Sequence, residues 1–314
     1  MIRIGLDVMG GDYAPEATIA GAILAQKELA VDAKIILIGN QDTIEKLLIK
    51  HGANISWFEI IHSTEVIEMG DHPSKAFTQK PNSSISVGFQ MLQAGSIDGF
   101  ASAGSTGAMM VGAMYTVKSI PGVIRPTITS PIPKMNGNST ILLDVGLNSD
   151  CKPEVLYQYG ILGSLYTEFV CNINNPKVGL LNIGSEPEKG NNLTKATYQL
   201  MAETKDFNFV GNIEGNEIFD DKADVVVCDG FVGNVVLKQA EAVFHLARYR
   251  KLNDEYFNRF NFEIYGGTPI LGVNGNVVIG HGVSNDIAIK NMILHTKDVI
   301  HAKLPEKIKE FFKE

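Results

Sequence analysis

Short runs of β-branched residues alternate with longer amphipathic stretches from one end of the chain to the other, and this alternation constrains the fold more than any other feature. In the first unit, residues 2–8 have the composition of a strand, residues 9–14 that of a turn, and residues 15–30 that of a helix with proline in its first turn. Strands that are joined by helices usually pair in parallel. The sequence therefore predicts an α/β protein with a mainly parallel sheet.

The same alternation predicts elements along the rest of the chain. Strands are expected at residues 34–38, 55–61, 99–102, 140–145, 178–182, 207–211 and 224–228. Helices are expected at residues 42–51, 84–94, 107–117, 153–169, 192–203, 235–250 and 285–302. Because no repeat or low-complexity linker occurs, we expect one large α/β domain with a single continuous core over residues 1–314.

Composition and charge exclude several classes of protein. A chain of 314 residues with 45% hydrophobic and 20% charged residues buries a large core. The net charge of −8 argues against a nucleic-acid partner, because phosphate backbones are bound by clustered Lys and Arg. Three widely separated cysteines without CxxC spacing predict neither disulfides nor a zinc site, which fits a reducing cytoplasm. Neither a signal peptide nor an apolar run of about 20 residues occurs. We therefore expect a soluble protein, or at most one that lies on a membrane surface.

A basic and aromatic segment at about residues 239–264 is predicted to form a helical arm. Its basic side chains are Arg248, Arg250, Lys251 and Arg259. Two interpretations stay open. The arm is a solvated helix face or a dimer contact, or it binds an acidic protein or anionic lipid at the inner face of the membrane.

Four turns rich in Gly, Ser, Thr or Asn follow predicted strands, at residues 9–12, 103–107, 182–186 and 229–234. In an open parallel sheet such turns gather at the carboxyl edge, where glycine lets backbone N–H groups approach an anion. Tight connections also use glycine for steric reasons alone, so the anion site depends on the occurrence of all four turns. The candidate ligands are Gly10, Gly11, Asp12, Gly104, Ser105, Thr106, Gly107, Gly184, Glu186, Asp229, Gly230, Gly233 and Asn234.

The absence of two nucleotide-binding motifs limits the kinds of anion that these turns are expected to bind. Neither a Walker motif nor a GxGxxG fingerprint follows a predicted strand, so nucleoside triphosphates and dinucleotides lose their usual binding loops. Orthophosphate remains, and no cofactor is expected. Lys189 follows the third turn, Lys238 lies one helical turn beyond the fourth, and His72 and Lys75 lie in the segment 70–75. Each can neutralise a bound phosphate, although an exposed lysine is more often only a surface charge.

Acidic and nucleophilic residues give no sign of metal or covalent catalysis. Asp12, Asp144 and Asp229 fall at strand ends, where helix capping is the usual role. No DxD or HExxH spacing occurs, so no metal is expected. No GxSxG elbow occurs, and Cys228 lies inside an apolar strand. Direct attack by a bound small nucleophile is therefore the simplest mechanism.

Six stretches of the sequence together resemble the PlsX family, which transfers acyl groups from acyl carrier protein to phosphate. They are DVMGGD at residues 7–12, SAGSTG at 102–107, LDVGLN at 143–148, GLLNIG at 179–184, VVVCDGFVGN at 225–234 and YGGTPILG at 265–272. The chain departs from the family at Ser105, where asparagine is usual, and in a shorter segment between Lys238 and Tyr265.

The resemblance implies a three-layer α/β/α sandwich similar to isocitrate and isopropylmalate dehydrogenases and to phosphotransacetylases. It also implies a homodimer that makes acyl-phosphate for phospholipid synthesis, with contact to the membrane and hand-over to a membrane glycerol-3-phosphate acyltransferase. Asn148, in the third stretch, joins the candidate ligands.

In the expected mechanism, Lys189, Lys238 and His72 or Lys75 hold phosphate while one of its oxygens attacks the thioester carbonyl. Backbone amides of residues 104–107 or 230–234 stabilise the oxyanion, and His72 or His281 protonates the leaving thiolate. The expected catalytic residues are His72, Lys75, Lys189 and Asn234. The basic residues of the arm dock the acidic carrier protein.

Three alternatives stay open beside this mechanism. The first is a phosphotransacetylase-like enzyme that acts on short acyl-CoA. The second is an NAD-dependent decarboxylating dehydrogenase. The third is a non-catalytic scaffold that binds acyl carrier protein and a membrane partner.

Overall fold

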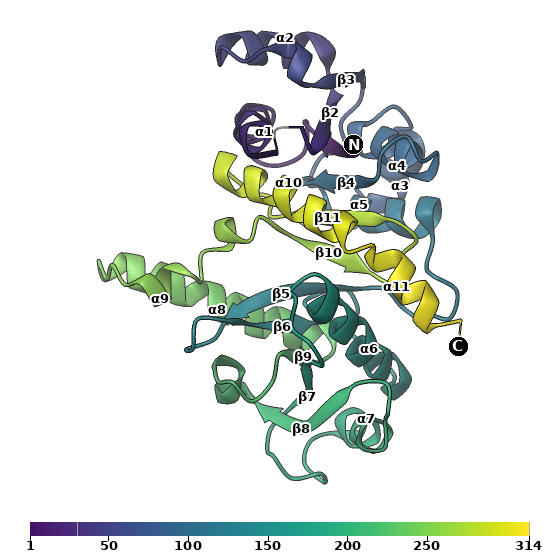
Figure 1. The fold of residues 1–314 in the computed structure, drawn as a ribbon, viewed down its shortest axis with the longest axis vertical. Coiled ribbons are helices and arrows are strands. Elements are labelled where there is room, and N and C mark those ends of the chain that lie inside the picture. The colour runs from purple at the N-terminus through teal and green to yellow at the C-terminus, as the bar shows by residue number, and fades with distance from the viewer. Residues whose placement is uncertain (30, 314) are drawn as a thin grey trace. The chain divides into compact units, whose positions relative to one another are not determined.

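The computed structural model describes residues 1–29 and 31–313, which divide into two compact units (Figure 1). The first unit comprises Met1–Ile120 and Phe262–Pro305, and the second comprises Pro121–Asn261 and the described residues from Glu306 on. The last residue of the helix predicted at 15–30 lies outside the described residues. A single continuous core over the whole chain stays a prediction.

The sheet of the first unit has the strand order β3-β2-β1-β4-β11-β10, and all neighbouring pairs are parallel except β10 with β11. Its strands are β1 (Ile2–Asp7), β2 (Ala33–Gly39), β3 (Glu59–His62), β4 (Gly99–Ser102), β10 (Gly267–Leu271) and β11 (Asn276–Gly280). The carboxyl ends of β1, β4 and β11 therefore lie at one edge of the sheet.

Helices cover both faces of this sheet. They are α1 (Glu16–Leu29), α2 (Gln41–Lys50), α3 (Pro73–Gln79), α4 (Ser84–Gln93), α5 (Thr106–Gly112) and α10 (Asp286–His301), with short turns η1 (Ile55–Trp57), η2 (Ala113–Val117) and η4 (Phe262–Ile264). On β4, Gly99 packs against Ile300 of α10, whereas Phe100 packs against Gly88 of α4. Because successive strand residues face opposite sides, α4 and α10 lie on opposite faces.

The sheet of the second unit has the order β5-β6-β9-β7-β8, in which only the pair β5 and β6 is antiparallel. Its strands are β5 (Thr127–Pro133), β6 (Ser139–Leu143), β7 (Lys177–Asn182), β8 (Asn208–Glu214) and β9 (Val225–Val227). Together with the first unit, this arrangement confirms the mainly parallel sheet that the sequence predicts.

The helices of the second unit are α6 (Pro153–Phe169), α7 (Asn192–Ala202), α8 (Gly230–Tyr249) and α9 (Glu255–Asn258), with the turn η3 (Gly215–Phe219). Gly163 of α6 packs against Leu143 and Val225 on one face of the sheet. Figure 1 shows α8 on the other side of these strands. The last helix, α11 (Leu304–Phe311), has residues in both units. In the described part of the chain, no helix combines the length and apolar character that a membrane crossing needs.

Several elements differ from the prediction, and two of these differences have simple physical causes. The strand β5 is not predicted because Pro131 and Pro133 lack the N–H group that a strand normally offers. The hairpin of β10 and β11 and the short helix α3 are also not predicted. Helix α8 begins at Gly230 rather than at residue 235, because glycines in its first turn look like turn residues in the sequence.

Candidate functional site

In the first unit, three loops meet where β1, β4 and β11 end. The backbone amide of Asp12 donates a 2.7 Å hydrogen bond to the carbonyl of Gly282, which joins the loop after β1 to the loop after β11. A Cβ atom added to Gly11 would lie 3.4 Å from Cβ of Ala103, in the loop after β4. The structure thus brings together the turns at residues 9–12 and 103–107, as their positions at strand ends predict.

Basic side chains lie beside the second of these turns. His72 is the N-cap residue of α3, and a Cβ atom added to Gly107 would lie 2.4 Å from Cγ of the adjacent Pro73. This close contact places the first turn of α3 against the beginning of α5. Among the described residues, the side chains of His72, Lys75 and Thr106 are exposed and make no hydrogen bond or ion pair. They are therefore available to bind an anion.

Two other predicted ligands in this unit are already engaged. The Ser105 hydroxyl accepts a hydrogen bond from the Ala108 amide at 3.3 Å and so caps α5. The amide of Gly104 donates to Oγ of Ser102 at 2.9 Å. Because that amide is used inside the protein, the expected role of Gly104 as an oxyanion donor is not supported. His281 stacks on Phe262 with ring centroids 4.6 Å apart, at the end of β11.

In the second unit, a buried carboxylate organises the turn after β6. Asp144 is fully buried, and it accepts hydrogen bonds from the amides of Gly146 (3.2 Å), Leu147 (3.1 Å) and Asn148 (2.7 Å). Burial raises the pKa of Asp144, although the bonds from Asn148 and from the two other amides act in the opposite direction. The side-chain amide of Asn148 also donates to Asp144, at 2.9 Å, so Asn148 is fixed in place.

The turn after β9 packs directly on the turn after β6. The Gly230 amide donates to the carbonyl of Asn148 at 2.7 Å. A Cβ atom added to Gly233 would lie 1.9 Å from the Asp144 carbonyl oxygen, so no other residue fits there without a shift of the backbone. Asn234 donates from Nδ2 to the carbonyl of Val145 at 3.2 Å. The Gly230 amide is therefore not free to stabilise an oxyanion.

Asp229 caps the first turn of α8, which is the usual role of an aspartate at a strand end. Its side chain accepts a 2.9 Å hydrogen bond from the amide of Val232 in the first turn of α8. On the same helix, the ammonium of Lys238 lies 2.8 Å from Oε2 of Glu241. This ion pair reduces the positive charge that Lys238 can offer to a phosphate.

The turn after β7 carries a free cation. Asn182 and Asn212 hold this turn, since Asn182 donates to the carbonyl of Lys189 at 3.2 Å and Asn212 donates to that of Glu186 at 2.8 Å. A Cβ atom added to Gly184 would lie 2.9 Å from Cγ of Lys189. Among the described residues, the exposed ammonium of Lys189 makes no hydrogen bond or ion pair. Lys189 is thus the basic residue of this turn that can bind an anion.

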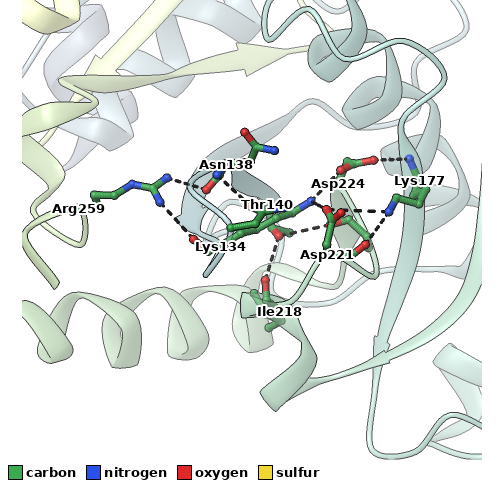
Figure 2. Close-up of polar contacts among 10 residues, drawn as sticks. Lys134, Asn138, Thr140, Lys177, Ile218, Asp221, Asp224 and Arg259 are labelled. Carbon is green, nitrogen blue, oxygen red and sulfur yellow. Dashed lines mark hydrogen bonds and ion pairs between the residues drawn. The ribbon is translucent and has the colours of Figure 1, made fainter. Parts of the chain in front are cut away.

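The basic residues of the arm fall into two groups. Arg248, Arg250 and Lys251 are exposed at the end of α8. Arg259, in contrast, donates to the carbonyls of Lys134 (3.1 Å) and Asn138 (2.6 Å), which belong to the hairpin of β5 and β6 (Figure 2). The guanidinium of Arg259 therefore holds the arm to the sheet, which leaves the other three residues for the predicted docking of a partner.

The same hairpin contains a buried ion cluster that the sequence does not reveal. The ammonium of Lys134 is fully buried and lies 2.7 Å from Oδ1 of Asp224 and 3.0 Å from Oδ1 of Asp221 (Figure 2). Lys134 holds the pKa of Asp221 below its usual value. This cluster lies at the amino ends of β6, β7 and β9, opposite the turns described above, so its role is structural.

Solved structures place this arrangement in a known class of fold. The EutD phosphotransacetylase from Staphylococcus aureus and a phosphotransacetylase from Streptococcus pyogenes align with 95% of this chain and 94% of their own, with TM-scores of 0.66 and 0.64 and 18% identity. A 4-hydroxythreonine-4-phosphate dehydrogenase from Burkholderia phymatum aligns with a TM-score of 0.50. The chain is thus an α/β protein with the phosphotransacetylase fold, which confirms the predicted fold class.

Sequence comparison defines the family. The family model described as "fatty acid synthesis protein" matches residues 2–307. Phosphate acyltransferases of Desulforamulus reducens and Dictyoglomus turgidum are 44% and 40% identical to this chain, over 99% and 98% of it and 97% of each relative. The chain belongs to the fatty acid synthesis protein family, which is the PlsX family that the six sequence stretches resemble.

Proposed function

We propose that this protein transfers a fatty acyl group from acyl carrier protein to inorganic phosphate and so makes acyl-phosphate for phospholipid synthesis. The observation that carries the proposal is the alignment with phosphate acyltransferases over almost the whole of both chains. The free cations beside glycine turns in each unit are consistent with an anionic substrate.

In the first unit, we assign phosphate binding to His72, Lys75 and Thr106. All three are exposed, without partners among the described residues, and the first turn of α3 is packed against the beginning of α5. Gly10, Gly11 and Gly107 let the backbone of the turns approach closely. His72 and His281 are the candidates for protonating the leaving thiolate.

In the second unit, we assign a catalytic role to Lys189, supported by the fixed turn that carries it. Its ammonium is a compact positive charge that can stabilise the oxyanion. We assign substrate contacts to Asn234 in the first turns of α8, and to Asn148 and Glu186 in the turns after β6 and β7. Lys238 remains a weaker candidate because of its pairing with Glu241.

The reaction needs no nucleophile from the protein. A phosphate oxygen attacks the thioester carbon, a tetrahedral oxyanion forms, and its collapse breaks the carbon–sulfur bond and releases the thiolate, which takes up a proton. Holding two reactants in contact contributes roughly 7–11 kcal/mol of barrier reduction, so positioning outweighs the effect of any single acid or base.

The test is the loss of acyl carrier protein thioester with and without phosphate, with acyl-phosphate trapped by hydroxylamine. Loss that depends on phosphate and yields acyl hydroxamate supports the proposal. Binding of the carrier protein without phosphate-dependent loss would instead identify a scaffold. Faster turnover of acetyl-CoA than of long acyl carrier protein thioesters would favour the phosphotransacetylase-like alternative, and NAD reduction would identify a dehydrogenase.

We also propose that the arm of the second unit docks the acidic carrier protein. Its docking residues are Arg248, Arg250 and Lys251, which are exposed on a protein with a net charge of −8. Leu246 and Tyr249 beside them are 63% and 84% exposed, which supports contact with a membrane surface as well. In this proposal the protein is a cytoplasmic homodimer that hands acyl-phosphate to a membrane glycerol-3-phosphate acyltransferase.

Reversing the three charges together, Arg248→Glu, Arg250→Glu and Lys251→Glu, should raise the KM for acyl carrier protein thioester. We expect a rise of roughly tenfold, because each exposed pair contributes about 0.2–1 kcal/mol, and a smaller rise at high salt. The KM for an acyl-CoA surrogate should not change. The control is Lys195→Glu with Lys205→Glu, which reverses two exposed charges elsewhere on the unit. Equal effects of the triple variant on both substrates would remove the docking assignment.

A further inference from the structure

We propose that Asp7 and Ser102 form a buried relay that couples the glycine turn after β1 to the glycine turn after β4 and so sets the geometry of phosphate binding in the first unit. The inference deepens the proposed function and rests on it. In this role both are positioning residues, because neither side chain reaches the surface where a substrate would lie. Both side chains are fully buried.

The relay is a continuous set of hydrogen bonds across residues far apart in the sequence. At the end of β1, Oδ1 of Asp7 accepts the amide of Met9 at 3.0 Å. Oδ2 of Asp7 accepts the hydroxyl of Ser102 at 2.7 Å, and Oγ of Ser102 accepts the amide of Gly104 at 2.9 Å. The two carboxylate oxygens thus connect one turn directly, and the other through a single hydroxyl.

The two turns can approach this closely only because Gly10 and Gly104, at the point of contact, lack side chains. A Cβ atom added to Gly10 would lie 2.3 Å from Oδ2 of Asp7 and 2.7 Å from the amide nitrogen of Gly104. A Cβ atom added to Gly104 would lie 3.1 Å from Cα of Gly10. The carboxylate of Asp7 therefore lies where the two turns meet, so a small displacement of this carboxylate would move both turns together.

A carboxylate at this position is costly for the fold, which argues for a function. Asp7 follows Leu6 and precedes Val8, both of which are fully buried in the apolar core. Burial raises the pKa of Asp7, and the bonds from Ser102, Ser84 and the Met9 and Gly10 amides counteract this only in part. Buried groups that break the apolar pattern of a core are typical of functional sites.

The consequence concerns the residues that bind phosphate. The Gly104 amide, fixed by Ser102, sets the path of the chain into Thr106 and Gly107. Gly107 in turn contacts Pro73, next to His72. Loss of the relay should therefore displace the phosphate ligands of this unit, while it leaves Lys189 and the other assigned residues of the second unit unchanged.

The test uses Ser102→Ala in the full-length protein, with Ser86→Ala as the matched control. Ser86 is also a buried serine of this unit, with one hydrogen bond to the Lys80 carbonyl and one from the Ser83 hydroxyl, and its side chain has no hydrogen bond to either turn among the described residues. We expect Ser102→Ala to raise the KM for phosphate by roughly 10–100-fold, as for other residues that orient a ligand-binding group, with the KM for the thioester unchanged. Both variants should lower the free energy of unfolding in urea by similar amounts. Ser86→Ala, however, should leave both KM values unchanged.

A second variant and a binding measurement separate the possible failures. Asp7→Asn should raise the phosphate KM at least as much as Ser102→Ala, and calorimetry with inorganic phosphate should show the same loss of affinity without any turnover. If the wild-type protein turns over thioester and Ser102→Ala has an unchanged phosphate KM, the relay is overturned while the proposed function stands. If the wild-type protein shows no turnover, the proposed function fails, and unchanged phosphate affinity in both variants overturns the relay separately.

Discussion

Replacing Asp224 with alanine should lower the free energy of unfolding by about 3–5 kcal/mol, the usual cost of removing one partner from a buried ion pair. Asp224 accepts a hydrogen bond from the ammonium of Lys134 at 2.7 Å and another from the backbone amide of Lys177 at 2.9 Å. Without Asp224, the fully buried ammonium of Lys134 would keep, among the described residues, only Asp221 as an acidic partner, and the side chain of Asp221 is 61% exposed. The measurement is urea unfolding of the whole chain followed by circular dichroism.

Two controls separate the buried charge from the loss of packing. Asp221→Ala removes the exposed partner of the same lysine and should cost less than about 1 kcal/mol. Lys134→Met combined with Asp224→Ala removes both buried charges and should be more stable than Asp224→Ala alone, because no buried ammonium is left unpaired. If the double variant is less stable than Asp224→Ala, the explanation by an unpaired charge is wrong.

Replacing Lys189 with methionine should lower kcat for phosphate-dependent thioester loss by roughly 10²–10³-fold, which is the effect of losing one oxyanion-stabilising group in other enzymes. The physical reason is that Lys189 is a free ammonium on a turn held by two asparagines. Methionine is also unbranched and only one atom shorter, and it lacks the ammonium with its charge and its three N–H donors. Initial rates at saturating phosphate and thioester measure the effect.

The matched control for Lys189→Met is Lys195→Met, which removes the charge of an exposed lysine on α7 in the same unit. It should leave kcat unchanged. The unfolding transition of both variants should match that of the wild-type protein, since neither ammonium makes an ion pair among the described residues. A loss in kcat that is equal in the two variants would show that net charge, rather than Lys189 itself, is responsible.

Much of the fold could be predicted because local chemistry marks it. The helix predicted at 153–169 is found at the same residues, since proline at its first position and the spacing of its apolar residues both point to a helix. The start of α8 was hidden because Gly230 and Gly233 are poor helix formers. Tertiary packing requires glycine at both positions, because the backbones of Asn148 and Asp144 occupy the space that side chains would need.

The meeting of glycine turns within each unit was predictable, whereas the bonding inside these turns was not. Glycine turns at strand ends mark one edge of the sheet in each unit, but residue types do not show which amides are already used. Ser102 bonds to Asp7 across 95 positions of sequence, and Lys134 bonds to Asp224 across 90. Such pairs depend on which strands become neighbours, so a single sequence carries little sign of them.

The attachment of α9 to the hairpin of β5 and β6 affects how a partner could bind. Tyr256 donates its hydroxyl to the carbonyl of Pro133 at 3.2 Å, and its ring packs edge-on against Phe260, which is almost fully buried. With Arg259 bonded to the same hairpin, the segment that follows α8 is tied down at its far end. A surface that is already ordered loses little conformational entropy on association. A protein that binds this segment would therefore not have to order it first.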